Sequence, residues 1–242
     1  MVELNNAHID FVSVNAEAPG APPDTAAKSM AHWYKDMDRY AGDGQSTYKN
    51  CVPMFDAVTA GYVFTTPCDI LFQESNGKLE ARVLDDRHLD FVEQRTPMAN
   101  FYHPPGFYED HFAWLSRWAV SLAPGYSALY LTPINRFDLP FWNTTGIIDN
   151  DKITTPGRVP FFVRRGFTGV LPAGTPFMQV IPFKRESWTA AAVPQTPEQI
   201  GRNLKRALRF RSQKTDYYRD KSWTRKKYKP TDTAGCPNTQ NT

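Results

Sequence analysis

The chain has 242 residues, of which 41% are hydrophobic and 22% charged, as is typical of one globular domain or of one domain with an appendage. Its 20 prolines exclude long uninterrupted helices and predict many turns and strand ends. No stretch approaches the roughly 18 apolar residues of a membrane helix, so we expect no membrane partner. Residues 1–15 lack a basic segment followed by an apolar run, so no secretory signal is expected.

The cysteines indicate a reducing compartment. Cys51, Cys68 and Cys236 are odd in number and widely spaced, and no two form a CxxC pair. This spacing supports neither a disulfide scaffold nor a zinc site. A cytoplasmic location is the simplest expectation.

Charge is distributed unevenly along the chain. Residues 202–229 hold 12 Lys or Arg against Asp216 and Asp220, a net charge of +10. The other residues hold 16 basic and 23 acidic side chains, a net charge of −7. The sequence therefore predicts an acidic body with a basic C-terminal segment.

The first half of the chain predicts strands and one helix. A strand-like run covers 8–14, and apolar residues at three-to-four spacing over 26–40 predict a short amphipathic helix. The stretch 60–72 consists of two β-rich runs on either side of Pro67, and Asn76-Gly77 predicts a tight hairpin turn. Periodicity leaves residues 107–120 open between helix and strand.

The stretch 123–188 is dense in short apolar runs closed by Gly, Pro, Asn or Asp. Strands are expected at 127–132, 160–164 and 177–181, with two carboxylates presented on a turn at 146–151. Apolar runs this short, bounded by turn residues, indicate a sandwich or barrel-like sheet. The fold class is therefore mainly β.

The C-terminal part predicts a different structure. Thr196-Pro197-Glu198-Gln199 is typical of a capping box that begins a helix, expected from about 197 to about 215. Residues 230–242 have little apolar content and are expected to be flexible. The predicted organisation is a β-rich domain over 1–190, a basic helical extension over 191–229, and a flexible tail over 230–242.

Two resemblances add expectations to this interpretation. Residues 51–69, the APGYSALYLTPINR run and the GVLPAGTPFMQVIPFKRESW run together resemble a family of uncharacterised proteins of tailed phages and some bacteria. That resemblance implies a phage or prophage origin, with the host cytoplasm or the virion as location, and it leaves function open.

The order of segments also resembles the fold shared by dUTP pyrophosphatase and dCTP deaminase, called a β-clip. Ala60-Gly61-Tyr62 matches its opening motif, although Val63 stands where that family has an acid. Gly146 to Lys152 matches the Gly-apolar-Ile-Asp-x-Asp-Tyr motif except that Lys152 replaces the Tyr, and Gly174 to Ile181 matches the motif that ends in Gln and apolar residues. The family's Pro-Arg-Ser-Gly turn is replaced by residues 132–136, and its glycine-rich C-terminal motif has no counterpart.

This second resemblance implies a site. Asp149 falls on the acid that orients the attacking water, and Gln179 on the position that faces phosphate. It further implies Mg²⁺ as cofactor of a nucleotide hydrolase, and a homotrimer. The observation that would test the site is whether Asp149 and Gln179 line one concave subunit interface. The candidate ligand-binding residues are Gln179, Arg136, Asn135, Asp151 and Gly146. The alternative is structural: Asp149 and Asp151 would make a polar turn, and Gln179 would pair with backbone in a strand.

Two sets of histidines and acids are weaker candidates for a metal site. His88-Leu89-Asp90 has the spacing of an iron(II) ligand pair but lacks a later histidine, and His103 and His111 could collect a metal beside Glu109 and Asp110. No metal site is predicted from them.

The basic segment could contact a nucleic acid or an acidic protein, or it could be a solvated helix. Its candidate contacts are Lys205, Arg206, Arg209, Arg211, Arg225, Lys226 and Lys227.

Three functions follow from these observations. The first is a phage-type ligand-binding or assembly module with degraded nucleotide motifs. The second is a metal-dependent deoxynucleotide hydrolase or deaminase that uses Asp149. The third is a virion structural protein that docks through its basic helix.

Overall fold

The computed structural model describes residues 7–95, 102–212 and 217–233. Contacts divide the chain into two units. The first, here called the β unit, comprises Met1–Ser29, Ala60–Arg185 and Tyr228–Thr242. The second, here called the helical unit, comprises Met30–Thr59 and Glu186–Lys227. Residues 30–59 therefore group with the C-terminal segment and not with the strands that flank them in sequence.

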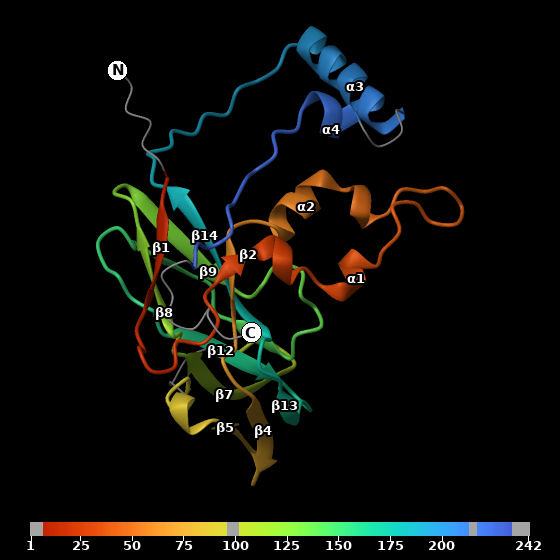
Figure 1. The fold of residues 1–242 in the computed structure, drawn as a ribbon. Helices are drawn as coiled ribbons and strands as arrows, with labels where there is room; N and C mark the ends of the chain where they lie inside the picture. The colour runs from red at the N-terminus through yellow and green to blue at the C-terminus, as the bar shows by residue number, and fades with distance from the viewer. Residues whose placement is uncertain (1–6, 96–101, 213–216, 234–242) are drawn as a thin grey trace. The chain divides into compact units, whose positions relative to one another are not determined.

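The β unit is built from antiparallel sheets (Figure 1), so the expectation of a mainly β chain is confirmed. None of the sheets in the described ranges closes into a barrel. The largest sheet has the order β11 (Gly146–Ile148), β9 (Tyr126–Leu131), β14 (Pro176–Lys184), β3 (Tyr62–Thr65) and β2 (Asp24–Thr25). A four-stranded sheet has the order β10 (Phe141–Asn143), β12 (Val159–Arg164), β7 (Phe107–Trp114) and β6 (Val92–Arg95). The smaller sheets are β13 (Gly169–Leu171), β4 (Ile70–Ser75) and β5 (Lys78–Val83), and the pair β1 (Ile9–Ser13) and β8 (Trp118–Leu122).

Aromatic side chains from three of these sheets form the core. Trp114 of β7 stacks on Phe161 of β12, with ring centroids 3.7 Å apart and an interplanar angle of 8°. Phe177 of β14 meets Trp114 at 5.1 Å, and Phe72 of β4 meets Phe161 at 6.4 Å. Large aromatic rings bury enough apolar area to dominate core energetics, and these rings join the three sheets in one core.

Residues with positive φ determine the turn between β4 and β5 and the start of β3. Asn76 and Gly77 have φ of 53° and 74° and form the two-residue turn between β4 and β5, as expected. Gly61, just before β3, has φ of +68°, and a Cβ there would lie 2.0 Å from the carbonyl oxygen of Val180 in β14. Only glycine fits so close a backbone approach, which fixes the start of β3 against β14.

Helical segments are short except for one. The β unit contains the 3-10 turns η1 (Ala26–Ser29) and η3 (Asp86–His88). The helical unit contains α1 (His32–Lys35), η2 (Tyr48–Asn50), α2 (Val52–Val58), α3 (Pro197–Ser212) and α4 (Tyr217–Lys221). In the described ranges, no helix combines the length and apolar character that crossing a bilayer requires.

One local expectation was wrong. The amphipathic helix over 26–40 is replaced by η1 and the four-residue α1, and Met30 and Ala31 between them are not helical. Residues 51–56, to which the sequence assigned no element, contribute most of α2, and Pro53 sits in its first turn, where a missing N–H costs nothing. The open question at 107–120 is decided by two strands, β7 and the start of β8.

The capping box at the start of α3 forms. The backbone N–H of Thr196 donates to Gln199 Oε1 at 2.7 Å, and the N–H of Gln199 donates to Thr196 Oγ1 at 3.3 Å. These reciprocal bonds satisfy two of the donors that a helix leaves open at its start. Of the tail expected to be flexible, residues 234–242 lie outside the described residues, whereas Thr231 donates through Oγ1 to the carbonyl of Pro23.

Candidate functional site

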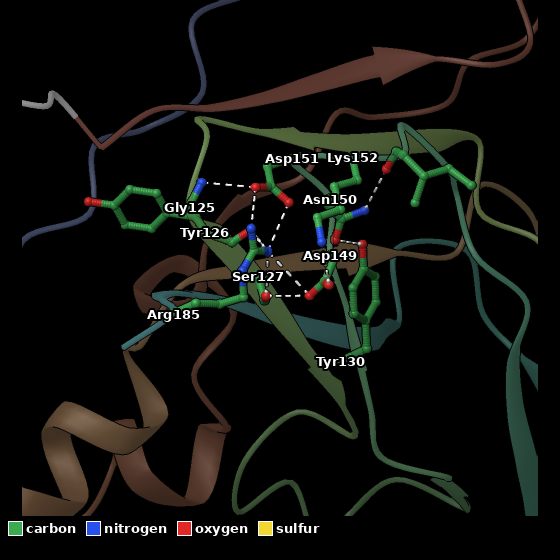
Figure 2. A network of polar contacts seen from close by, with 10 residues as sticks. Gly125, Tyr126, Ser127, Tyr130, Asp149, Asn150, Asp151, Lys152 and Arg185 are labelled. Atoms are coloured by element: carbon green, nitrogen blue, oxygen red, sulfur yellow. Dashed lines mark hydrogen bonds and ion pairs between the residues drawn. The ribbon is translucent and has the colours of Figure 1, made fainter. Parts of the chain in front are cut away.

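The two carboxylates of the central turn lie beside Arg185, at the end of β14 (Figure 2). Asp151 accepts from Arg185 Nη1 at 2.8 Å through Oδ1, and its Oδ2 contacts Nη2 and accepts from the backbone N–H of Gly125 at 2.8 Å. The Asp151 side chain is 6% exposed. The hydrogen bonds from Arg185 hold the pKa of Asp151 far below its usual range, with the Gly125 N–H as the second cause.

Asp149 is the more exposed of the two carboxylates, at 45%. Its Oδ1 accepts from Ser127 Oγ at 2.6 Å and lies 3.3 Å from Arg185 Nη1, and Lys152 Nζ is 3.8 Å from Oδ2. The Ser127 hydrogen bond, followed by the charges of Arg185 and Lys152, lowers the pKa of Asp149. Asp149 is therefore an anion whose charge is already balanced inside the chain, which makes it a weak base for orienting water.

The residue between the carboxylates is an anchor. Asn150 is 1% exposed, and its Oδ1 accepts from Tyr130 Oη at 2.9 Å. Its Nδ2 donates to the carbonyl of Val120 at 3.2 Å (Figure 2 shows the network). Burial raises the pKa of Tyr130, so its hydroxyl stays protonated and remains a donor. The turn after β11 is thus fastened to β9 and β8.

Gln179 is buried in the middle of β14, at 1% exposure. Its Oε1 accepts from the backbone N–H of Ile134 at 2.8 Å, and its Nε2 donates to the carbonyl of Ala60 at 2.6 Å. The side chain therefore joins the turn after β9 to the segment that enters β3. Both ends of the amide serve backbone groups, and the side chain presents no surface to a phosphate in this conformation.

The remaining ligand-binding candidates, Arg136, Asn135 and Gly146, have roles in the fold. Arg136 donates to Asp138 through Nε at 2.9 Å and Nη2 at 2.7 Å, and through Nη1 to the carbonyl of Ser29 at 3.1 Å. Asn135 has φ of 58°, a left-handed conformation that asparagine tolerates in turns. Gly146 pairs with Tyr130 in the ladder between β11 and β9.

Strand β9 separates the candidates into two groups. Ser127, which binds Asp149, lies near the start of β9, and Leu131, which pairs with Gln179, lies at its end. Four residues of extended chain span about 14 Å. Within one chain the structure therefore brings Asp149 and Asp151 together, and Gln179 close to Asn135 and Arg136, but it does not bring the two groups to one site.

The histidine candidates are tied to arginines or to the core. His88 is 3% exposed and its Nδ1 accepts from Arg117 Nε at 3.2 Å, while Arg117 Nη1 donates to Asp90 at 3.0 Å. Burial lowers the pKa of His88, and burial lowers that of His111, whose ring lies 5.6 Å from Phe162. No cluster of three or more His, Cys, Asp or Glu able to hold a metal is found among the described residues.

In the helical unit, part of the basic segment is already paired. Lys226 Nζ lies 2.7 Å from Asp56 Oδ2 in α2, and Trp223 Nε1 donates to the same oxygen at 2.9 Å. The Trp223 ring meets Phe55 edge-on at 6.4 Å. Of the other basic candidates, Lys205, Arg206 and Arg209 are exposed on α3, Arg225 and Lys227 are exposed after α4, and Arg211 is in α3 but its side chain lies outside the described residues.

Helix α3 carries an apolar stripe that remains exposed. Ile200, Leu204 and Leu208, four residues apart, are 53%, 62% and 56% exposed. Residues at i and i+4 lie one above the other on a helix, so the three form one continuous strip. The sequence placed them on one face, but nothing in it showed that the face stays uncovered. The sequence did not indicate that Arg185 and Ser127 bind the carboxylates of the central turn, because only the fold brings them there.

The chain was compared with protein-family models, with curated proteins and with solved structures, and none of the three comparisons gives a match.

Proposed function

We propose that this chain is an assembly module that docks onto a protein partner through α3, and that it does not turn over nucleotides. The exposed stripe of Ile200, Leu204 and Leu208 carries the proposal. Burying such a side chain stabilises by about 1.5–3 kcal/mol, and an amphipathic helix with anchors at this spacing is a recurring protein-recognition element. The phage-type family that residues 51–69, 123–136 and 169–188 resemble would provide a setting in which the partner is an assembling particle.

Charge indicates what kind of protein the partner is. Helix α3 holds five Arg or Lys and one acid, Glu198, a net charge of +4. A partner with an apolar groove and an acidic rim would match it, because complementary charge speeds encounter and selects against wrong partners. The rest of the chain is acidic overall, so the excess of positive charge lies in α3 and the residues that follow it.

A nucleic acid is supported less well than a protein. Base stacking needs aromatic faces beside the basic residues. Trp223 is the tryptophan within the basic segment 202–229, but its indole N–H is bound to Asp56 and its ring meets Phe55. The phosphate backbone would also leave the apolar stripe of α3 without a partner.

A catalytic role for the central turn is also supported less well. The charge of Asp149 is balanced by Ser127, Arg185 and Lys152, and the Gln179 amide is bound to backbone at both ends. These contacts agree with a β-clip-like scaffold whose nucleotide motifs now serve the fold. A hydrolase would need both groups free to meet a triphosphate and its Mg²⁺.

Photo-crosslinking in the native cells tests the docking proposal. Benzoyl-phenylalanine at position 204 should give a discrete protein adduct, because that position is in the centre of the stripe. The matched control is the same probe at Arg202, two residues away and on the opposite side of α3. Equal adducts at both positions, or none at 204, would show that α3 is not a docking helix.

A further inference from the structure

The chain contains an acidic and apolar surface that complements α3. Residues 84–90, which contain η3, hold three acids and one Arg, a net charge of −2. Leu84 and Leu89, on either side of η3, are 48% and 61% exposed. Between them Asp86 is exposed. Here this set of Leu84, Asp86 and Leu89 is called the η3 patch.

Asp86 differs from its acidic neighbours in having an open carboxylate. Asp85 is bound by Arg87, with Nη2 to Oδ2 at 2.7 Å, and Asp90 is bound by the buried Arg117. In the described part of the chain, Asp86 has no ion-pair partner. It is therefore the carboxylate of the η3 patch that a basic side chain from outside could bind without breaking an existing pair.

Helix α3 offers the matching groups in the matching order. Lys205 follows Leu204 directly and lies three residues before Leu208, so it borders the apolar stripe. Arg202 lies on the opposite side of the helix. The apolar stripe of Ile200, Leu204 and Leu208, bordered by Lys205, thus complements the two leucines that flank Asp86.

We propose that the partner of α3 is a second copy of this chain, with α3 of one copy docked on the η3 patch of the next. This inference rests on the proposed docking role of α3 and names its partner. Pairing α3 with another α3 would bring two helices of net charge +4 together, whereas the η3 patch has the opposite charge. The two surfaces differ, so the contact is head-to-tail and builds a ring or an open chain of copies.

The proposed contact joins only the stripe of α3 and Lys205 to the three residues of the η3 patch. Association should therefore be weak and dependent on concentration. Interfaces below about 1,200 Å² belong to transient encounters. We expect a dissociation constant within about 5–200 μM. Sedimentation velocity of the purified full-length chain should therefore show an average mass that rises with concentration across this range. Leu204→Glu should abolish the rise, because it places a charge in the centre of the apolar strip.

A charge swap identifies the contact. Lys205→Glu and Asp86→Lys should each weaken association by about tenfold, the double variant should restore it, and Arg202→Glu should leave it nearly unchanged at physiological salt. All three side chains are exposed, and circular dichroism checks that each variant folds.

Each contrary outcome overturns the inference in a recognisable way. If α3 pairs with α3, Lys205→Glu would strengthen association and Asp86→Lys would have no effect. If α3 docks on its own chain, the mass would stay monomeric at every concentration. A monomer whose position 204 crosslinks to a different protein in native cells would refute the second-copy inference and leave the docking function standing. A monomer without any such crosslink would refute both.

Discussion

Arg185 and Asp151 form a two-point ion pair that joins the end of β14 to the turn after β11. Nη1 lies 2.8 Å from Oδ1, and Nη2 contacts Oδ2. The same guanidinium reaches Ser127 Oγ at 3.0 Å and the carbonyl of Tyr126 at 2.9 Å. One side chain therefore fastens three segments of the largest sheet, and the carboxylates of the turn are better explained as architecture than as catalysts.

The first prediction concerns the pH dependence of stability. Hydrogen bonds from Arg185 and Gly125 depress the pKa of Asp151 in the folded chain below the unfolded value of about 3.9. The carboxylate therefore contributes its full stabilisation above about pH 4 and loses it as the pH falls further. Asp151→Asn should lower the free energy of unfolding at pH 6, and the gap to the parent chain should narrow toward pH 3.

Urea unfolding at several pH values checks this first prediction, with Asp36→Asn as control. Asp36 is exposed and forms no ion pair among the described residues. A gap that stays constant from pH 6 to pH 3 would contradict the role given to the Asp151 carboxylate.

The second prediction concerns Gln179. Gln179→Leu leaves the N–H of Ile134 and the carbonyl of Ala60 without their buried partner. Because an unsatisfied buried group costs about 1–3 kcal/mol, the free energy of unfolding should fall by about 2–4 kcal/mol. The same substitution at Gln73, an exposed residue of β4, should change it by less than about 0.5 kcal/mol. Similar losses at the two positions would argue against the bridging role.

The third prediction concerns the aromatic core. Trp114 is fully buried and its Nε1 donates to Asn143 Oδ1 at 3.0 Å, so Trp114→Ala should cost about 3–5 kcal/mol. Trp142 is 41% exposed on β10, and Trp142→Ala should cost about 1 kcal/mol or less. Thermal unfolding followed by circular dichroism measures both. An equal loss would mean that the stack of Trp114 on Phe161 does not organise the core.

The fourth prediction concerns catalysis. A panel of deoxynucleoside triphosphates with Mg²⁺ or Zn²⁺ should give neither pyrophosphate nor ammonia above the protein-free rate, because Asp149 is held by Ser127 and Arg185. Asp149→Asn should therefore not change the rates. Turnover by the parent chain that this substitution abolishes would restore the hydrolase hypothesis and would require subunits that bring Asp149 and Gln179 together.

Local chemistry made part of the structure predictable. Asn76-Gly77 indicated the turn between β4 and β5 because few other pairs tolerate two positive φ values. Thr196 and Gln199 indicated the start of α3 because their side chains satisfy its open donors. The run at 51–56 could not be assigned because its apolar composition suits strand and helix equally, and Pro53 is compatible with the first turn of α2.

The sequence by itself determined that the chain is mainly β, where many of its turns fall, and that its basic charge gathers near the C-terminus. Tertiary structure alone decided what the polar residues do. Asp151 meets Arg185, and Gln179 meets Ile134 and Ala60, across 34 to 119 residues of chain. Sequence spacing cannot show such contacts, because strand order and register set which side chains share a face. The same holds for Ile200, Leu204 and Leu208, whose periodicity defines a stripe but whose exposure depends on what else packs against it.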